Sequence, residues 1–163
     1  RRIVHEAGGL LYYDGANLLQ WIRDVPRPPH PWAVEGRVWR QRYAGGVVLH
    51  SAIGYRGYFA GPGVHILDIM GLADPLLARL PMENRSDWRI GHFARPVPEG
   101  YFESLQRDEN LLADPDLARF YDKIRLITRG DLFEPERLRA IWELNTGQYA
   151  SWVDHYVARS AED

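Results

Sequence analysis

Two aspartates lie close together in the segment 53–81, and their spacing could support acid–base chemistry. Asp68 lies in the short apolar run 64–70, and Asp74 follows six residues later, directly before Pro75. Two carboxyls at a strand-to-helix turn can act as general acid and base on a glycosidic bond. Aspartate before proline is also a typical helix start, in which the carboxylate caps the helix. A hydrolase that uses Asp68 and Asp74 is therefore one hypothesis, and a structural role for both residues is another.

Other side chains of this region could bind a sugar without cleaving it. Aromatic rings cover the apolar face of a sugar, while carboxylates, imidazoles and guanidiniums bind its hydroxyls. Such residues occur in the glycine-rich start of the segment, in the apolar run, in 88–95 and in the proline-rich stretch 25–32. The candidate ligand-binding residues are Asp68, Arg89, His92, Tyr55, Tyr58, His65, His30 and Trp32.

Composition and missing motifs exclude several function classes. The 163 residues contain no cysteine, and the formal net charge of −2 gives no electrostatic basis for binding nucleic acid. His65 and Asp68 match no zinc signature, and the glycines match neither the dinucleotide nor the phosphate-loop pattern. We therefore expect no metal, no cofactor and no nucleic-acid partner.

The length is typical of one domain, and the pattern predicts an α+β fold. We expect a small, mainly antiparallel sheet in the N-terminal half, packed against several C-terminal helices. Residues 16–24 could form two helical turns, and 25–32 a stiff polyproline-like connection. The alternation in 34–40 and the Ala-Gly-Gly turn after it predict a hairpin over 34–48. The apolar run 64–70 predicts a buried strand that enters a turn.

From Asp74 onward the sequence is typical of helices. Asp74 and Asp114 each precede a proline, so both are expected to cap a helix, and Asp→Ala at either position should cost about 1 kcal/mol. Further helices are predicted from Pro98, from Pro135 and over the aromatic stripe 149–157. We interpret this C-terminal half as scaffold, because aromatic residues at helical spacing usually belong to a core.

Asp68 at the end of an apolar strand needs a cation or a hydrogen-bond donor. Arg89 and His92 are the nearest candidates, so we expect the glycine-aromatic segment and 88–95 to lie side by side on one polar face. If that face is open, Asp68 and His92 could bind sugar hydroxyls. If it is closed, the same residues form a satisfied buried network.

The segment 54–101 resembles a known family. Its motifs are the glycine-aromatic stretch 54–61, Asp-x-x-Gly-Leu-x-Asp-Pro at 68–75 and Arg-x-Gly-His at 89–92. Together they are similar to the C-terminal soluble region of bacterial GT-C-type membrane glycosyltransferases, the terminal arabinofuranosyltransferase-like group. The flank Pro-His-Pro-Trp at 29–32 is also similar.

The resemblance implies an extracytoplasmic domain attached to an N-terminal transmembrane module of the same polypeptide. In such enzymes the donor is a polyprenyl-phosphate-linked sugar, and the catalytic carboxylate belongs to a loop of the membrane module, with no matching position here. The implied role is accessory: contact with a cell-envelope acceptor glycan, bracing of the membrane module, or both. The start at Arg1, without a signal peptide, fits a domain excised from a larger protein. A purely structural domain with no ligand remains an alternative.

Overall fold

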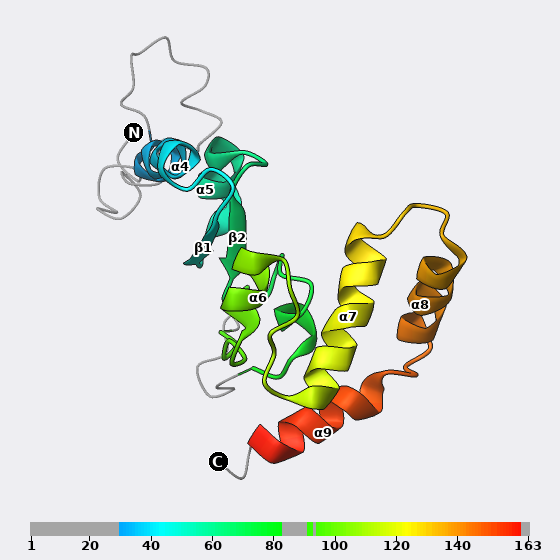
Figure 1. The fold of residues 1–163 in the computed structure, drawn as a ribbon. Coiled ribbons are helices and arrows are strands. Elements are labelled where there is room, and N and C mark those ends of the chain that lie inside the picture. The colour runs from blue at the N-terminus through cyan, green and yellow to red at the C-terminus, as the bar shows by residue number, and fades with distance from the viewer. Residues whose placement is uncertain (1–29, 83–90, 93, 161–163) are drawn as a thin grey trace, which may run out of the picture. The chain divides into compact units, whose positions relative to one another are not determined.

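The computed structural model describes residues 30–82, 91–92 and 94–160 (Figure 1). The chain divides into two compact units. The N-terminal unit comprises Arg1–Ala44 and Gly54–Val64, and the C-terminal unit comprises Gly45–Ile53 and His65–Asp163. Within the described residues, no helix is both long enough and apolar enough to cross a bilayer.

The N-terminal unit contains a helix where the sequence predicts the first strand of a hairpin. Helix α4 covers Pro31–Arg42 and buries Ala33, Gly36 and Trp39. His30 caps it, because its Nδ1 accepts a hydrogen bond from the Trp32 amide at 3.2 Å. The predicted hairpin over 34–48 is therefore wrong. The alternation in 34–40 overlaps a three-residue spacing of small and aromatic residues, and this spacing places one helical face in the core.

A second helix, α5, covers Ile53–Ala60 and packs against α4. The two backbones approach closely at Gly36, where an added Cβ would lie 2.4 Å from the carbonyl oxygen of Arg56. The Arg40 guanidinium then closes the end of α5 by donating to the Ala60 carbonyl at 3.2 Å. Glycine at position 36 is thus required by close backbone contact.

The C-terminal unit starts with a two-stranded sheet that is parallel, not antiparallel as expected. Strands β1 (Val47–His50) and β2 (His65–Asp68) pair in the register Val47↔His65 to His50↔Asp68. Residues 51–64 separate the strands and include a helix, whereas an antiparallel pair could be joined by a tight turn. The predicted buried strand within 64–70 is confirmed: Leu67 and Asp68 are buried and a turn follows.

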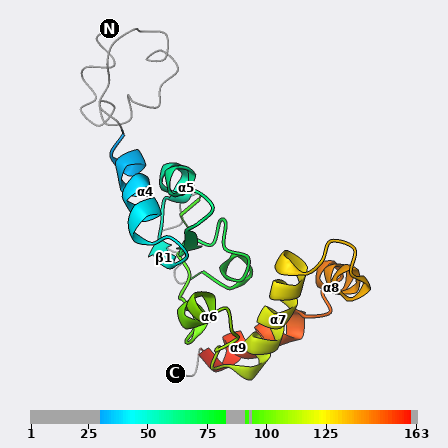
Figure 2. The same cartoon turned by 45° about the horizontal axis from the view of Figure 1, so that its top comes forward.

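The predicted C-terminal helices are confirmed, and with them the α+β fold class. They are the 3₁₀ helix η2 (Leu77–Arg79), α6 (Tyr101–Arg107), α7 (Pro115–Arg129), α8 (Pro135–Asn145) and α9 (Ala150–Ser160). Both α8 and α9 contact α7, the longest of them (Figures 1 and 2). The core is formed by Leu67, Leu76, Leu77, Leu80, Tyr101, Leu112, Leu117, Phe120, Tyr121, Ile124 and Tyr149.

The predicted helix cap at Asp114 is confirmed, whereas Asp74 caps a turn, because the 3₁₀ helix η2 has Leu76 as its N-cap. Asp114 Oδ1 accepts hydrogen bonds from the amides of Asp116 at 3.0 Å and Leu117 at 2.9 Å, at the start of α7. Asp74 does the same for the short turn that leads into η2, with Leu76 and Leu77 as donors. The predicted turns over 16–24, most of the proline-rich stretch, and Arg89 lie outside the described residues.

Candidate functional site

The N-terminal unit brings four of the predicted ligand-binding residues into one group of rings. The His30 imidazole stacks on Tyr55 with centroids 4.8 Å apart and meets Trp32 edge-on at 5.3 Å. Tyr55 lies 6.1 Å from Phe59, which meets Tyr58 edge-on at 5.1 Å. We call these five residues, His30, Trp32, Tyr55, Tyr58 and Phe59, the aromatic cluster. It joins the start of α4 to α5.

Two arginines lie over the faces of two rings of the aromatic cluster. The Arg56 guanidinium lies 4.6 Å from the ring centre of Trp32, and the Arg37 guanidinium lies 4.8 Å from that of Phe59. Both are cation–π distances, which stabilise and orient the rings. Arg56 is buried and its Nε is 2.6 Å from a carboxylate oxygen of Glu35. The cluster therefore has fixed ring positions and charged groups at its edge.

Tyr58 is the member of the cluster that is most open to a ligand. Its exposed fraction is 79%, whereas His30, Trp32, Tyr55 and Phe59 are half-buried. An exposed phenol ring whose neighbour is fixed offers a flat apolar surface at little cost in side-chain entropy. That combination suits stacking on a sugar ring.

Replacing Gly36 by alanine is expected to disrupt the aromatic cluster. The new methyl group would clash with the Arg56 carbonyl, so α4 and α5 must separate at a cost of roughly 1–3 kcal/mol. Gly54→Ala on α5 is the matched control, because nothing lies within 4 Å of its Cβ position. This change should stabilise α5 by about 0.5–1 kcal/mol through helix propensity. Thermal unfolding and the Trp32 environment in near-UV circular dichroism check both; equal behaviour of the variants would contradict the close contact.

Asp68 is closed to ligands. It is 1% exposed, and its carboxylate accepts hydrogen bonds from the amides of Met70 at 3.1 Å, Leu72 at 2.9 Å and Ala73 at 3.0 Å. The sequence predicted that Arg89 and His92 would donate hydrogen bonds to Asp68. Backbone amides of the following turn donate them instead. Asp68 shapes that turn, and His92 is exposed on the surface.

Asp74 is also buried, at 2% exposure. Besides its two cap bonds, the carboxylate accepts a hydrogen bond from the Tyr101 hydroxyl, which lies 3.0 Å from each carboxylate oxygen. Burial raises the pKa of Asp74, and the hydrogen bonds from Leu77 and Tyr101 act in the opposite direction. Since a glycosidase needs both carboxyls at an open cleft, this geometry supports a structural role for Asp68 and Asp74.

His65 lies at the start of β2 and lines a cavity with residues of α7. Burial lowers the pKa of His65, the Asp74 carboxylate raises it, and Arg129, which lines the same cavity, lowers it. The sequence interpretation of the C-terminal half as scaffold missed the basic side of this cavity. The available signal was a pair of arginines, Arg125 and Arg129, one helical turn apart.

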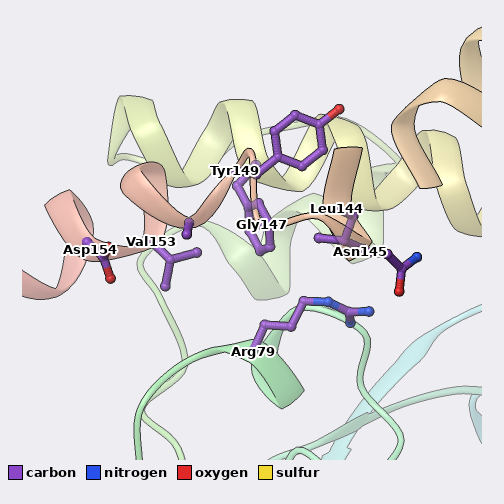
Figure 3. Close-up of a pocket in the computed structure, with 9 residues that line it drawn as sticks. Arg79, Leu144, Asn145, Gly147, Tyr149, Val153 and Asp154 are labelled. Atoms are coloured by element: carbon purple, nitrogen blue, oxygen red, sulfur yellow. The ribbon is translucent and has the colours of Figure 1, made fainter. Parts of the chain in front are cut away.

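A second hollow, of about 460 Å³, lies in the C-terminal unit (Figure 3). Figure 3 shows Arg79 on one wall, facing the wall that carries Asn145 and Val153. The Tyr149 hydroxyl donates a hydrogen bond to Glu143, and its ring stacks on Trp152 with centroids 4.9 Å apart. Burial and the Glu143 carboxylate raise the pKa of Tyr149 to about 12. The lining combines polar side chains, such as Arg79 and Asn145, with apolar ones, such as Leu144 and Val153.

The part of the chain that the structure describes contains no group of three or more histidine, aspartate or glutamate side chains placed to hold a metal ion.

Comparison with known proteins places the chain in a family. The sequence model described as a domain of unknown function, DUF8728, matches residues 30–161. The chain belongs to this family. The match begins at His30, the cap of α4, and therefore includes the aromatic cluster, the sheet and all the C-terminal helices. No curated protein and no solved structure matches the chain.

Proposed function

We propose that this DUF8728 chain is a glycan-contacting accessory domain of an extracytoplasmic membrane glycosyltransferase, without a catalytic site of its own. The observation that carries the proposal is the aromatic cluster. His30, Trp32, Tyr55 and Tyr58 were selected as sugar-binding candidates from the sequence, and they come from two separate segments that meet on α4 and α5. The membrane context, with an N-terminal transmembrane module and a cell-envelope glycan as partners, rests on the sequence resemblance.

The chemistry of the cluster suits a neutral sugar. The exposed Tyr58 ring can cover the apolar face of one sugar ring, with Phe59 holding it in place. Glu35 and Arg37 lie at the edge of the cluster, where charged groups can exchange hydrogen bonds with hydroxyls. A single exposed ring with charged groups nearby can bind a glycan without activating any bond in it.

Bracing of the membrane module is the second candidate role. Four large apolar side chains are exposed on α8 and in the loop before it: Leu132 at 65%, Phe133 at 82%, Leu138 at 49% and Trp142 at 60%. Large exposed apolar side chains often mark protein contacts. The role can coexist with glycan contact, because these residues belong to the C-terminal unit.

Titration of the chain with arabinan and galactan fragments, followed by amide NMR, tests glycan contact. Shifts are expected in residues of the aromatic cluster at millimolar sugar. Tyr58→Ala should weaken binding roughly tenfold, because it removes about 1.5 kcal/mol of ring burial. Phe133→Ala is the matched control: it removes an equally exposed ring from the other unit and should leave the affinity unchanged.

Equal losses in the two variants would show nonspecific aromatic stacking and contradict the assignment to the cluster. An absence of shifts with every glycan would leave bracing as the proposed role. The membrane context has its own test in the reading frame upstream of Arg1, where several membrane-spanning segments are expected.

A further inference from the structure

A cavity in the C-terminal unit collects donors and positive charge that the glycan proposal does not use. Its volume is about 210 Å³. Strand β2 contributes His65, and α6 contributes Tyr101. Helix α7 contributes a polar side, formed by Tyr121, Arg125, Thr128 and Arg129.

The two arginines share one carboxylate, so the cavity side carries a net positive charge. Arg125 Nη2 lies 3.1 Å from Asp108 Oδ1, and Arg129 bonds the same oxygen. Arg125 Nη2 also donates to the Asp108 carbonyl at 2.7 Å. Asp108 ends α6 in the left-handed conformation, with φ +54°. It therefore fixes both guanidiniums while neutralising only one of the two charges.

Tyr121 adds a hydroxyl donor. The residue is 2% exposed, and its hydroxyl has no hydrogen-bond partner among the described residues. Every fully buried side-chain nitrogen or oxygen of the described residues has a partner. The Tyr121 hydroxyl is therefore not fully enclosed, and Tyr121 lines the cavity. Burial raises the pKa of Tyr121, so the phenol keeps its proton and can donate it to a ligand.

His65 completes the set from the opposite element. The residue lines the same cavity as Arg125 and Arg129. The Asp74 carboxylate is engaged by Tyr101 and by two backbone amides, which reduces its repulsion of an anion. Guanidinium, phenol and imidazole donors that line one cavity suit a tetrahedral oxyanion.

We propose that this cavity binds a phosphate group, carried by inorganic phosphate, a soluble phosphomonoester or a lipid headgroup, between Arg125, Arg129, Tyr121 and His65. The arginine N–H groups that do not contact Asp108 donate hydrogen bonds to two of the phosphate oxygens. Tyr121 and His65 bind the others. The inference does not depend on the glycan-contacting function, since the aromatic cluster belongs to the other unit.

Isothermal titration of the whole chain with inorganic phosphate and with glycerol phosphate tests the site. Saturable binding to one site is expected, and Arg129→Gln should weaken it at least tenfold. The matched control is Arg139→Gln, which removes an arginine of α8 that pairs with Glu143 at 2.8 Å outside the cavity. Tyr121→Phe keeps the packed ring, so it tests the hydroxyl separately and should weaken binding several-fold even if Arg129→Gln misfolds.

Vesicles distinguish the sources of the phosphate. Binding to phosphatidic acid vesicles but not to phosphatidylcholine vesicles, lost in Arg129→Gln and Tyr121→Phe, would assign a lipid phosphomonoester. Binding of the soluble compounds with the same losses would assign a soluble phosphate. Absence of binding in both arms would overturn the proposal, as would equal losses in Arg139→Gln. Tyr58→Ala should retain phosphate binding whatever its effect on glycan.

Discussion

Replacing Gly100 by alanine is expected to destabilise the C-terminal unit by roughly 3–5 kcal/mol, through backbone strain and overpacking together. Gly100 has φ +79°, and a Cβ there would lie 1.9 Å from the carbonyl oxygen of Leu111. The opposing chain cannot move away freely. The Ser104 hydroxyl donates to the Gly100 carbonyl at 2.6 Å and accepts from the Leu111 amide at 2.8 Å. A methyl group at position 100 must therefore break this link.

Gly147→Ala separates the two causes. Gly147 has nearly the same backbone angle, φ +76°, but nothing lies within 4 Å of its Cβ position. The free energy of unfolding of this variant should fall only by the cost of the left-handed conformation, about 1–2 kcal/mol. Urea unfolding of the parent and both variants gives the free energies. Equal losses would mean that the loop around Leu111 yields easily.

Asp74→Ala is expected to cost about 3 kcal/mol, three times the effect predicted for a simple helix cap. The change removes two cap bonds and also leaves the Tyr101 hydroxyl without an acceptor in the core, where Tyr101 is fully buried. An unsatisfied buried hydroxyl carries a desolvation penalty of its own. Asp114→Ala is the comparison, since Asp114 caps α7 and pairs with Arg159 at the surface, where an ion pair contributes little, but has no buried phenol as a partner. Its loss should stay near 1 kcal/mol.

Denaturant titrations of both variants measure the difference. Tyr101→Phe in the Asp74→Ala background should recover part of the stability, because it removes the hydroxyl that lost its acceptor when Asp74 was replaced. Similar losses for Asp74→Ala and Asp114→Ala, with no recovery in the double variant, would show that the buried pair adds nothing to the cap.

Asp74→Asn gives this pair a pH signature. Burial raises the pKa of Asp74 above its ordinary value of 3.8, so the folded protein binds the proton more tightly than the unfolded chain. The resulting stabilisation is complete below the ordinary value and is lost as the pH rises through the folded pKa. The Asn side chain can still cap the turn and does not titrate. The stability of the parent relative to Asp74→Asn should therefore fall as the pH rises from 3.8 through the folded pKa of Asp74. Melting temperatures of the two proteins, measured at the same pH values, check this.

The helical half of the fold was predictable because its signals are local. Asp114 and the proline after it define the first turn of α7 through side-chain chemistry within three residues. The apolar spacing that follows places one face of the helix in the core, whatever the rest of the chain does. The strand β2 was predictable for a similar reason, since a short apolar run between glycines is too short for a typical helix.

The N-terminal helices and the candidate sites depend on contacts between distant residues. The alternation of 34–40 satisfies a strand as well as a helix, and the choice follows from the contact between Gly36 and the Arg56 carbonyl. The sequence alone determined that Asp68 needs donors at the end of an apolar strand. Only the tertiary structure decided that these donors are backbone amides, and that Arg129 of α7 and His65 of β2 line the same cavity. The physical reason is that such pairings depend on how elements pack, and no local pattern of residues records that geometry.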